Sequence, residues 1–475
     1  MRQNLLSLVL VALPFAVRAQ TPLKAGMPVC RVYPETLFQT MVGFGVGFNQ
    51  NTLHNIDAIK RASERERAYD MLYGPTGLRL DIVRLTISPD ARPAAKDATP
   101  VASPDLADYD WAADEHTQKV WKSIQPVLGR TKPILYAVPF TPPPQWKDTG
   151  KVAGGGVLLR EHYREYAAYL ASFLEYYHKV LHVDIDVLSL QNEPGVAAIW
   201  ASCKWTGEEL REFLKVLAPA VRARGLDPKF MLTEGTAWSG AWEHLQATLA
   251  QPEASRYLHI MASHSYGAPD DMARRLFAGA SAKSGLPVWM SEMSLMHKNE
   301  PDDPGMIAAL QTAGYLHRDL AEAHACAWIY CFAIYTATLQ QGSLGILSPS
   351  DGDGPQAGTL VVPKRFWAMA NYSRFVRPGW RLMRIDSSPG FANTAFIGPK
   401  GEGFVIVALN PGQQEITTTY DFGTRDIGGV EGYATTRELD LAGIAPPAAQ
   451  PHRFVATLPP MSVTTFTGKL AVMSH

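Results

Sequence analysis

Two glutamates each follow a short apolar run in this 475-residue chain. Glu193 ends the run VLSLQNE, and Glu292 ends the run VWMSE. Such runs are typical of buried strands, so each glutamate is expected at the end of a strand. Two facing carboxylates can hydrolyse a glycosidic bond, because one attacks the anomeric carbon while the other protonates the leaving oxygen. A single glutamate is more often a solvated surface charge, but two at matching strand ends favour the catalytic interpretation.

The elements that would position these glutamates alternate between strands and helices. Eight apolar, strand-like runs are separated by segments with apolar residues at helical spacing. Eight such units predict a (β/α)8 barrel, an α/β fold, and a doubly wound open sheet is the competing fold. The expected strands are Val42–Phe48, Ile82–Ile87, Lys132–Phe140, Val183–Gln191, Lys229–Thr233, His259–Tyr266, Pro287–Met293 and Ala325–Tyr335.

The sequence pattern changes near residue 377. Short alternating runs between Gly, Pro and Asn turns then predict a β-sandwich side domain at residues 377–475. Residues 20–39 are expected to add an N-terminal strand to this sandwich, and residues 40–376 to form the catalytic barrel. Active sites of such barrels lie at the C-terminal ends of the strands. Glu193 and Glu292, on the fourth and seventh strands, are therefore expected to face each other across the barrel mouth.

Residues 1–19 have the pattern of a secretory signal peptide, with a basic Arg2, an apolar run and small residues before Gln20. The run is too short to span a bilayer, so a secreted, extracellular protein is expected. Lys and Arg number 44 against 45 Asp and Glu, so no basic surplus favours nucleic acid. The expected partner is a polysaccharide substrate, with neither nucleic acid nor membrane, and the chain is expected to be a monomer.

Four cysteines permit no, one or two disulfides in a secreted protein. Cys326 and Cys331 stand five apart in one strand-like run, so their side chains point to opposite faces and are not expected to pair. Cysteine and histidine do not recur with the spacing of a metal site, so neither a metal nor another cofactor is expected.

Other classes of function fit the sequence less well. Gly43, Gly45 and Gly47 have the spacing GxGxG, whereas a dinucleotide-binding loop has GxGxxG. The GxSxG turn of a serine hydrolase is missing from the sequence. A non-catalytic carbohydrate-binding protein would keep the aromatic residues and lose a carboxylate, whereas both glutamates are present.

Several motifs together resemble those of glycoside hydrolase family 30. Residues 191–194 (QNEP) look like the acid/base signature of its clan of retaining barrel glycosidases, and residues 289–292 (WMSE) look like its nucleophile strand. Residues 141–158 are similar to the family's proline-tryptophan loop and glycine run, and residues 43–45 to its opening strand. The resemblance implies a barrel with a side β-sandwich fed from both termini. Residues 46–51 depart from the family's usual acidic or polar stretch, which leaves subfamily and substrate open.

The resemblance implies a role for each polar group at the mouth. Glu292 would be the nucleophile, and Arg84, at the end of the second strand, would lower its pKa. Glu193 would be the acid/base, with its pKa raised by the neighbouring carboxylate and by partial burial. Asn192 would hydrogen-bond the sugar 2-hydroxyl. A retaining mechanism requires the two carboxyl groups about 5 Å apart.

His264 and Tyr266, on the expected sixth strand, point to the same side because they are two residues apart. Tyr266 is expected to hydrogen-bond Glu292. His264 either contacts the sugar or is a structural histidine. Glu234, at the end of the fifth strand, either binds a sugar hydroxyl or is a solvated loop charge.

Aromatic platforms are expected in the sugar subsites, because pyranose faces present C–H groups that stack on rings. Trp146 and Trp238 are the favoured platforms, and Trp328, Trp200 and Trp205 are further candidates. Three other tryptophans are expected in the core or between domains, namely Trp289, Trp367 and Trp380.

The resemblance leaves several substrates open. Secreted members of the family commonly act on β-1,4-xylan, sometimes requiring a glucuronic acid branch, and others act on β-1,6-glucan, β-1,6-galactan or glucosylceramide. Arg and Lys are absent between Phe48 and Ile59 and between Phe332 and Pro363, where xylan-active relatives place a branch-binding cation. A xylanase without strict dependence on glucuronic acid, releasing short xylo-oligosaccharides, is therefore the favoured prediction.

Overall fold

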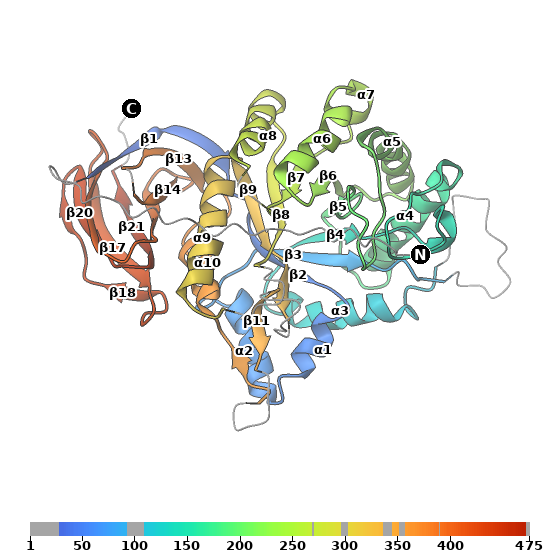
Figure 1. Ribbon diagram of the computed structural model, residues 1–475, viewed down its shortest axis with the longest axis horizontal. Coiled ribbons are helices and arrows are strands. Elements are labelled where there is room, and N and C mark those ends of the chain that lie inside the picture. Colours follow the sequence, from blue (N-terminus) through green and yellow to red (C-terminus); the bar gives the residue numbers. More distant parts are fainter. Residues whose placement is uncertain are drawn as a thin grey trace, which may run out of the picture.

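The computed structural model describes residues 28–92, 109–267, 270–295, 303–335, 344–350, 357–388 and 390–471. A closed barrel of eight parallel strands lies beside a separate sheet built mainly from C-terminal strands (Figure 1). The (β/α)8 prediction is confirmed, and the open-sheet alternative is wrong. The barrel strands are β2 (Gly43–Phe48), β3 (Ile82–Ile87), β4 (Ile134–Pro139), β5 (Val187–Ser189), β6 (Lys229–Gly235), β7 (Ile260–His264), β8 (Val288–Met293) and β9 (Ala325–Tyr330).

Helices cover the outside of the barrel (Figure 1). In α5, a capping box between Thr206 and Glu209 satisfies the first turn, and an apolar face with Leu210, Phe213 and Leu217 is buried. The described helices are α1 (Thr52–Asp57), α2 (Ala62–Tyr73), α3 (Glu115–Leu128), α4 (Tyr163–Lys179), α5 (Gly207–Ala223), α6 (Trp238–Leu249), α7 (Pro252–Ser255), α8 (Asp271–Ser284), α9 (Met306–Ala321) and α10 (Lys364–Ser373), with 3-10 turns η1 (Pro144–Trp146) and η2 (Arg160–His162).

The barrel strands are buried on both faces. One cluster fills the barrel interior and includes Tyr136, Met231 and Trp289. A larger cluster lies between the strands and the helices and includes Met290 and Trp328. Neighbouring residues of one strand, such as Trp289 and Met290, belong to different clusters because side chains alternate along a strand. The apolar runs of the sequence are therefore continuous and not alternating.

The second part is a ten-stranded sheet in the order β18-β17-β21-β15-β14-β13-β1-β16-β20-β19. Its halves face each other across an aromatic core, where Phe404 of β15 stacks on Phe454 of β20 with ring centroids 6.1 Å apart. Strand β1 pairs with both β13 and β16, so a segment near the N-terminus joins the C-terminal strands. The strands are β1 (Val29–Thr40), β13 (Arg381–Asp386), β14 (Ala392–Ile397), β15 (Gly403–Asn410), β16 (Ile416–Asp421), β17 (Ile427–Thr435), β18 (Ala442–Ile444), β19 (Ala448–Gln450), β20 (Arg453–Leu458) and β21 (Ser462–Leu470).

A small sheet follows the last barrel strand. Strands β10 (Phe332–Ile334), β11 (Gly345–Pro349) and β12 (Leu360–Val361) pair in that order. The expected eighth strand therefore breaks after Tyr330 into β9 and β10. The expected signal peptide lies outside the described residues.

The cysteines are all described, and all four are buried free thiols. Cys326 lies in the barrel interior, whereas Cys331 follows β9, so the expectation that they do not pair is confirmed. Burial raises the pKa of the Cys326 thiol to about 12, which keeps it protonated and unreactive.

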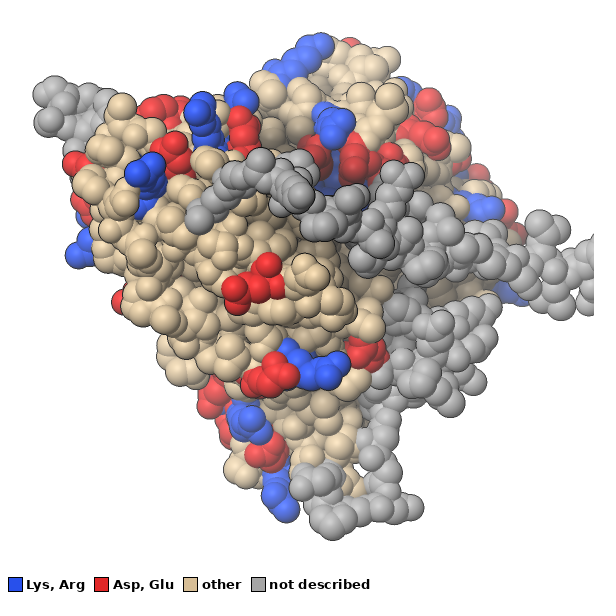
Figure 2. All heavy atoms as spheres, turned by 60° about the vertical axis from the view of Figure 1, so that its left-hand side comes forward, with Lys and Arg blue, Asp and Glu red and all other residues tan. Residues whose placement is uncertain are grey.

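Charges of both signs are mixed over the described part of the face that includes the side sheet (Figure 2). Broad areas of other residues separate them, and positive charge is not concentrated on this part of the surface. Among the described residues, the helices are too short or too polar to cross a bilayer.

Candidate active site

Five barrel elements bring charged side chains together at the mouth. Arg84 comes from β3, Glu193 from the segment after β5, Glu234 from β6, His264 from β7 and Glu292 from β8. Each of these side chains is at most 9% exposed. Charges that are buried so completely must compensate one another, because desolvation of an isolated charge is costly.

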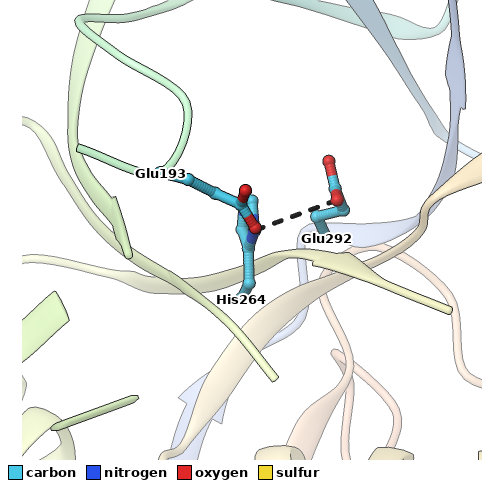
Figure 3. A group of neighbouring side chains, drawn as sticks. All are labelled: Glu193, His264 and Glu292. Carbon is cyan, nitrogen blue, oxygen red and sulfur yellow. Dashed lines mark hydrogen bonds and ion pairs between the residues drawn. The ribbon is translucent and has the colours of Figure 1, made fainter. Parts of the chain in front are cut away.

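The two predicted catalytic glutamates face each other. One carboxylate oxygen of Glu193, one of Glu292 and a ring nitrogen of His264 all lie within 4.8 Å of one another (Figure 3). This spacing falls near the value of about 5 Å that direct attack on the anomeric carbon requires, and below the separation of about 6.5–9.5 Å that leaves room for a water. The geometry therefore suits double displacement.

The backbone that presents Glu193 is irregular and braced. Glu193 has a φ of 47°, a left-handed conformation that non-glycine residues adopt mainly where the surroundings hold them. Its amide N–H donates to the Glu234 carbonyl oxygen at 3.0 Å, and the Asn192 N–H donates to the Pro139 carbonyl oxygen at 2.9 Å. The neighbouring barrel strands therefore hold the end of β5 in place.

Glu292 is held in its ionised form. Arg84 Nη1 lies 2.7 Å from Glu292 Oε2, and the Tyr266 hydroxyl donates to Glu292 Oε1 at 2.8 Å. Burial alone would raise the pKa of Glu292, but the positive charges of Arg84 and His264 and the Tyr266 hydrogen bond lower it overall. The expected contacts of Arg84 and Tyr266 with Glu292 are present, while the roles of these residues in a reaction stay predictions.

Asn192 lies beside the same arginine. Arg84 Nη2 donates to Asn192 Oδ1 at 2.6 Å. This contact fixes the orientation of the Asn192 amide, so that the two N–H donors of Nδ2 point away from Arg84. The sugar 2-hydroxyl stays the predicted acceptor of that group.

His264 lies between the carboxylates. Its Nδ1 is 3.2 Å from Glu193 Oε1, and its Nε2 is 3.6 Å from Glu234 Oε1. Burial would lower the pKa of His264, but Glu292, Glu193 and Glu234 raise it to about 9. The side chain is fully buried, so the expected sugar contact is wrong and the histidine binds Glu193 instead.

The prediction for Glu234 is wrong in both of its forms. The side chain is fully buried, so it is neither a solvated charge nor open to a sugar hydroxyl. It accepts a hydrogen bond from the Tyr136 hydroxyl, and it lies 3.6 Å from both Arg84 Nη2 and His264 Nε2. Burial would raise the pKa of Glu234, but His264 and Arg84 lower it to about 2. Sequence reasoning did not identify Tyr136, although it is a polar residue in an otherwise apolar strand.

The core packing expected for Trp289, Trp367 and Trp380 is confirmed, whereas the sugar-platform predictions for Trp238 and Trp328 are wrong. The indole N–H groups of Trp238 and Trp328 both donate to Asp319 of α9, behind the barrel wall, so neither ring lines the mouth. Trp146 packs on Tyr169 and is 9% exposed, which leaves little of its ring for a sugar.

Trp200, one of the further platform candidates, differs from Trp146, Trp238 and Trp328 because it is exposed. Trp200 is 49% exposed, and its neighbour Ile199 is 94% exposed. They lie on the loop between β5 and α5, a few residues after Glu193. Hydrogen bonds from Gly154 N–H to Ala198 O and from Ser202 N–H to Val152 O brace this loop. A loop tip tied to its neighbour in this way can present an apolar surface beside the acid/base.

The cluster of Glu193, His264 and Glu292 has atoms close enough to share a metal ion. Arg84, ion-paired with Glu292, opposes a further cation by charge. We therefore assign these groups to acid–base chemistry, and the expectation of no metal or cofactor stays a prediction.

A (β/α)8 barrel with two carboxylates at its mouth, one held by arginine and tyrosine, defines the site of a glycoside hydrolase. The model of the glycosyl hydrolase family 30 TIM-barrel domain matches residues 41–294. The chain belongs to this family and is a family 30 glycosidase, which confirms the resemblance found in the sequence.

Curated relatives have two kinds of activity in their names. The chain is 25% identical to glucuronoxylanase XynC from Bacillus subtilis over 369 residues, covering 75% of this chain and 79% of the relative. It is 26% identical to lysosomal acid glucosylceramidase from Mus musculus over 249 residues, covering 49% and 47%.

Solved structures share the complete architecture. The catalytic domain of the family 30 xylanase C from Talaromyces cellulolyticus matches with a TM-score of 0.77 at 22% identity. The match covers 94% of this chain and all of that domain, so the barrel and the side sheet occur together in both folds.

Proposed function

We propose that this protein is a secreted, retaining glycoside hydrolase that cleaves β-1,4-xylan. The observation that carries the proposal is the closeness of Glu193 and Glu292, whose oxygens lie within 4.8 Å at the barrel mouth. The ionisation state of Glu292 also supports the proposal, because a lowered pKa keeps the attacking carboxylate ionised.

In the first step, a Glu292 oxygen forms a bond to the anomeric carbon while the bond to the leaving oxygen breaks. Glu193 gives its proton to that oxygen, so the leaving group departs as an alcohol. Tyr266 and Arg84 hold Glu292 on the line of attack. The product of this step is a glycosyl–enzyme ester and an ionised Glu193.

In the second step, Glu193 takes a proton from water. The water oxygen bonds to the anomeric carbon, and the ester bond to Glu292 breaks, which regenerates both side chains. The sugar leaves with the anomeric configuration of the substrate, since the carbon is inverted twice.

Xylan is the proposed substrate because a curated relative that matches 75% of this chain is named a glucuronoxylanase. The segments between Phe48 and Ile59 and between Phe332 and Pro363 carry neither Arg nor Lys. A carboxylate-bearing branch needs a cation, best a bidentate arginine, so we propose action without strict dependence on glucuronic acid. Secretion is proposed from the signal-like residues 1–19.

A β-glucoside with an apolar leaving group is the second candidate, of the kind named in the glucosylceramidase relative. The exposed Ile199 and Trp200 favour it, because they present an apolar surface on the loop that carries Glu193. A xylan chain would use only the flat face of Trp200.

The test is a substrate panel with the purified full chain. Glucuronoxylan, arabinoxylan, β-1,6-glucan, β-1,6-galactan and micellar glucosylceramide are incubated, and products are separated by chromatography. Proton NMR of the first product formed distinguishes retention from inversion. Release of xylo-oligosaccharides as the β-anomer from both xylans supports the proposal. Activity on glucosylceramide alone moves the assignment to the second candidate, and an α-anomer first overturns double displacement.

A further inference from the structure

Glu234 is a third buried carboxylate that the two-step mechanism leaves without a role. Its side chain is fully buried at the end of β6, 3.6 Å from Arg84 Nη2. Its backbone has a φ of 51°, which is left-handed like that of Glu193. A buried charge in a strained backbone is costly, so a specific partner must account for it.

The geometry identifies that partner as His264. Glu234 Oε1 lies 3.6 Å from His264 Nε2, and the opposite ring nitrogen, Nδ1, lies 3.2 Å from Glu193 Oε1. The imidazole is therefore in line between Glu234 and the acid/base. The Glu234 carbonyl also accepts the Glu193 backbone N–H at 3.0 Å, so Glu234 is linked to Glu193 directly through the backbone and indirectly through His264.

A protonated His264 reduces the net negative charge of the buried cluster. Three carboxylates converge on the mouth, from Glu193, Glu234 and Glu292, and Arg84 is paired with two of them. A protonated His264 supplies a second positive charge between them, so that the buried cluster carries at most one net negative charge.

The other groups around His264 do not supply that charge. Glu292 Oε1 is 3.9 Å from Nδ1, and the Tyr266 ring packs edge-on at 5.9 Å between centroids. The Tyr136 hydroxyl is neutral, and it donates to Glu234 Oε1, the same oxygen that faces the imidazole.

We propose that Glu234 is a positioning residue that keeps His264 protonated, and that the imidazolium orients Glu193 and stabilises it once it has given up its proton. This inference rests on the proposed function, in which Glu193 protonates the leaving group. In the first step the Glu193 O–H bond breaks and the leaving oxygen gains the proton. The new carboxylate then accepts a hydrogen bond from His264 Nδ1–H, so the imidazolium stabilises the charge that forms in this step.

The proposal predicts a loss that depends on the leaving group. Glu234→Gln removes the negative charge beside His264 at nearly constant shape. We expect kcat/KM to fall at least ~10-fold for a glycoside with a poor leaving group, such as 4-methoxyphenol, because protonation by the acid contributes to that step. For the matching 2,4-dinitrophenyl glycoside the loss should be under about threefold, since that group leaves without a proton.

The pH profile is the second readout. Without the Glu234 charge, the Glu193–His264 pair loses a proton more easily, so the alkaline limb of kcat/KM moves to lower pH by at least ~1 unit. Glu234→Asp keeps the charge and should keep the limb near its wild-type position. Asp319→Asn removes a buried carboxylate outside the site and should leave both the limb and the leaving-group dependence unchanged.

Proton NMR of the histidine-labelled chain tests the pair without any substrate. The wild type should show imidazole N–H signals of a protonated His264 at neutral pH, assigned by their loss in His264→Gln, and Glu234→Gln should lose them too. Retained signals, or equal losses on both glycosides with an unmoved limb, overturn the proposal. A wild type that hydrolyses neither glycoside refutes the proposed function instead, while the NMR result still decides the charge of His264.

Discussion

Two clusters of buried charge lie on opposite sides of the barrel wall, and they are built differently. Behind the wall, the Asp319 carboxylate is fully buried and accepts four hydrogen bonds. The donors are Arg274 Nε at 2.8 Å, Ser265 Oγ at 2.9 Å, Trp238 at 3.1 Å and Trp328 at 3.0 Å. One carboxylate is thus matched by one guanidinium and three neutral donors.

At the mouth, three carboxylates share one guanidinium and one imidazole. Within the described part of the chain, Oε2 of Glu234, Oε2 of Glu292 and Nε2 of His264 have no hydrogen bond of good geometry. The Arg84–Glu292 pair is close, at 2.7 Å, but not aligned as a hydrogen bond. The hydrogen bonds of the mouth cluster are therefore only partly made, whereas those of the Asp319 carboxylate are made.

The contrast separates structural charge from catalytic charge. A buried group whose hydrogen bonds are all made stabilises one conformation. A group that is only partly matched is costly in the folded state, and an active site uses the remaining capacity for substrate and transition state. Substitutions in the two clusters should therefore affect different measurements.

The largest effect is expected for Glu292→Gln, which removes the nucleophile but keeps its shape. We expect kcat/KM to fall by at least ~10³-fold, because a covalent catalyst lowers the barrier by about 4 kcal/mol or more. Steady-state kinetics on the best substrate of the panel measures this. Residual activity within tenfold of wild type would show that another group attacks the anomeric carbon.

Asp319→Asn should affect folding and not chemistry. The substitution leaves the buried Arg274 with only the half-exposed Asp271, at 3.4 Å, as a counter-charge, which costs up to about 3–5 kcal/mol of unfolding free energy. Urea unfolding followed by tryptophan fluorescence measures the loss, and kcat/KM of the folded fraction should equal that of wild type. A selective loss of activity at full stability would place Asp319 with the catalytic groups and break the contrast.

Tyr266→Phe removes one hydrogen bond to Glu292 and little else. A hydrogen bond to a charged group contributes about 1.5–3 kcal/mol, so we expect kcat/KM to fall by ~10- to 10²-fold. The pKa of Glu292 should rise, which moves the acid limb of the pH profile to higher pH. An unchanged acid limb would mean that Arg84 and His264 hold Glu292 ionised without Tyr266.

The smallest effect concerns stability against pH at the mouth cluster. His264 has a pKa of about 9 in the folded chain against 6.5 when unperturbed, so the folded state binds its proton more tightly. The resulting stabilisation is fully present below pH 6.5 and is lost as the pH rises towards 9. Denaturant unfolding of wild type and His264→Gln at pH 6 and pH 9.5 should show a stability difference that shrinks at the higher pH. A constant difference would mean that His264 is neutral in the folded state.

Local sequence pattern was enough to predict the barrel and the strand ends that carry the two glutamates. Apolar runs that end in Asn192-Glu193 and Glu292 place both glutamates at one barrel mouth, since parallel strands end on the same side. The contact of Arg84 with Glu292 was implied by the resemblance to the family, and the expectation that Arg84 ends its strand is wrong, because it lies within β3. Tyr266 was expected near Glu292 from its place at the end of a strand.

Side-chain environment could not be predicted in the same way. Trp238 and Trp328 follow or belong to barrel strands as a sugar platform would, yet both point towards Asp319. Asp319 itself had a signal, because it lies on the buried face of α9 between Leu316 and Leu320. Its partners come from α6, α8, β9 and the segment after β7, which no local pattern specifies.

By itself, the sequence determined the fold class, the two opposing glutamates and their strand positions, because hydrophobic periodicity is a local property of the chain. Tertiary structure decided which polar groups share the buried charge. Glu234 and His264 are 30 residues apart, and each is 41 or more from Glu193, so their pairing depends on barrel closure and on the backbone of two strained strand ends. The exposure of the tryptophans also depended on tertiary structure, since the packing of the loops buries Trp146 and leaves Trp200 exposed.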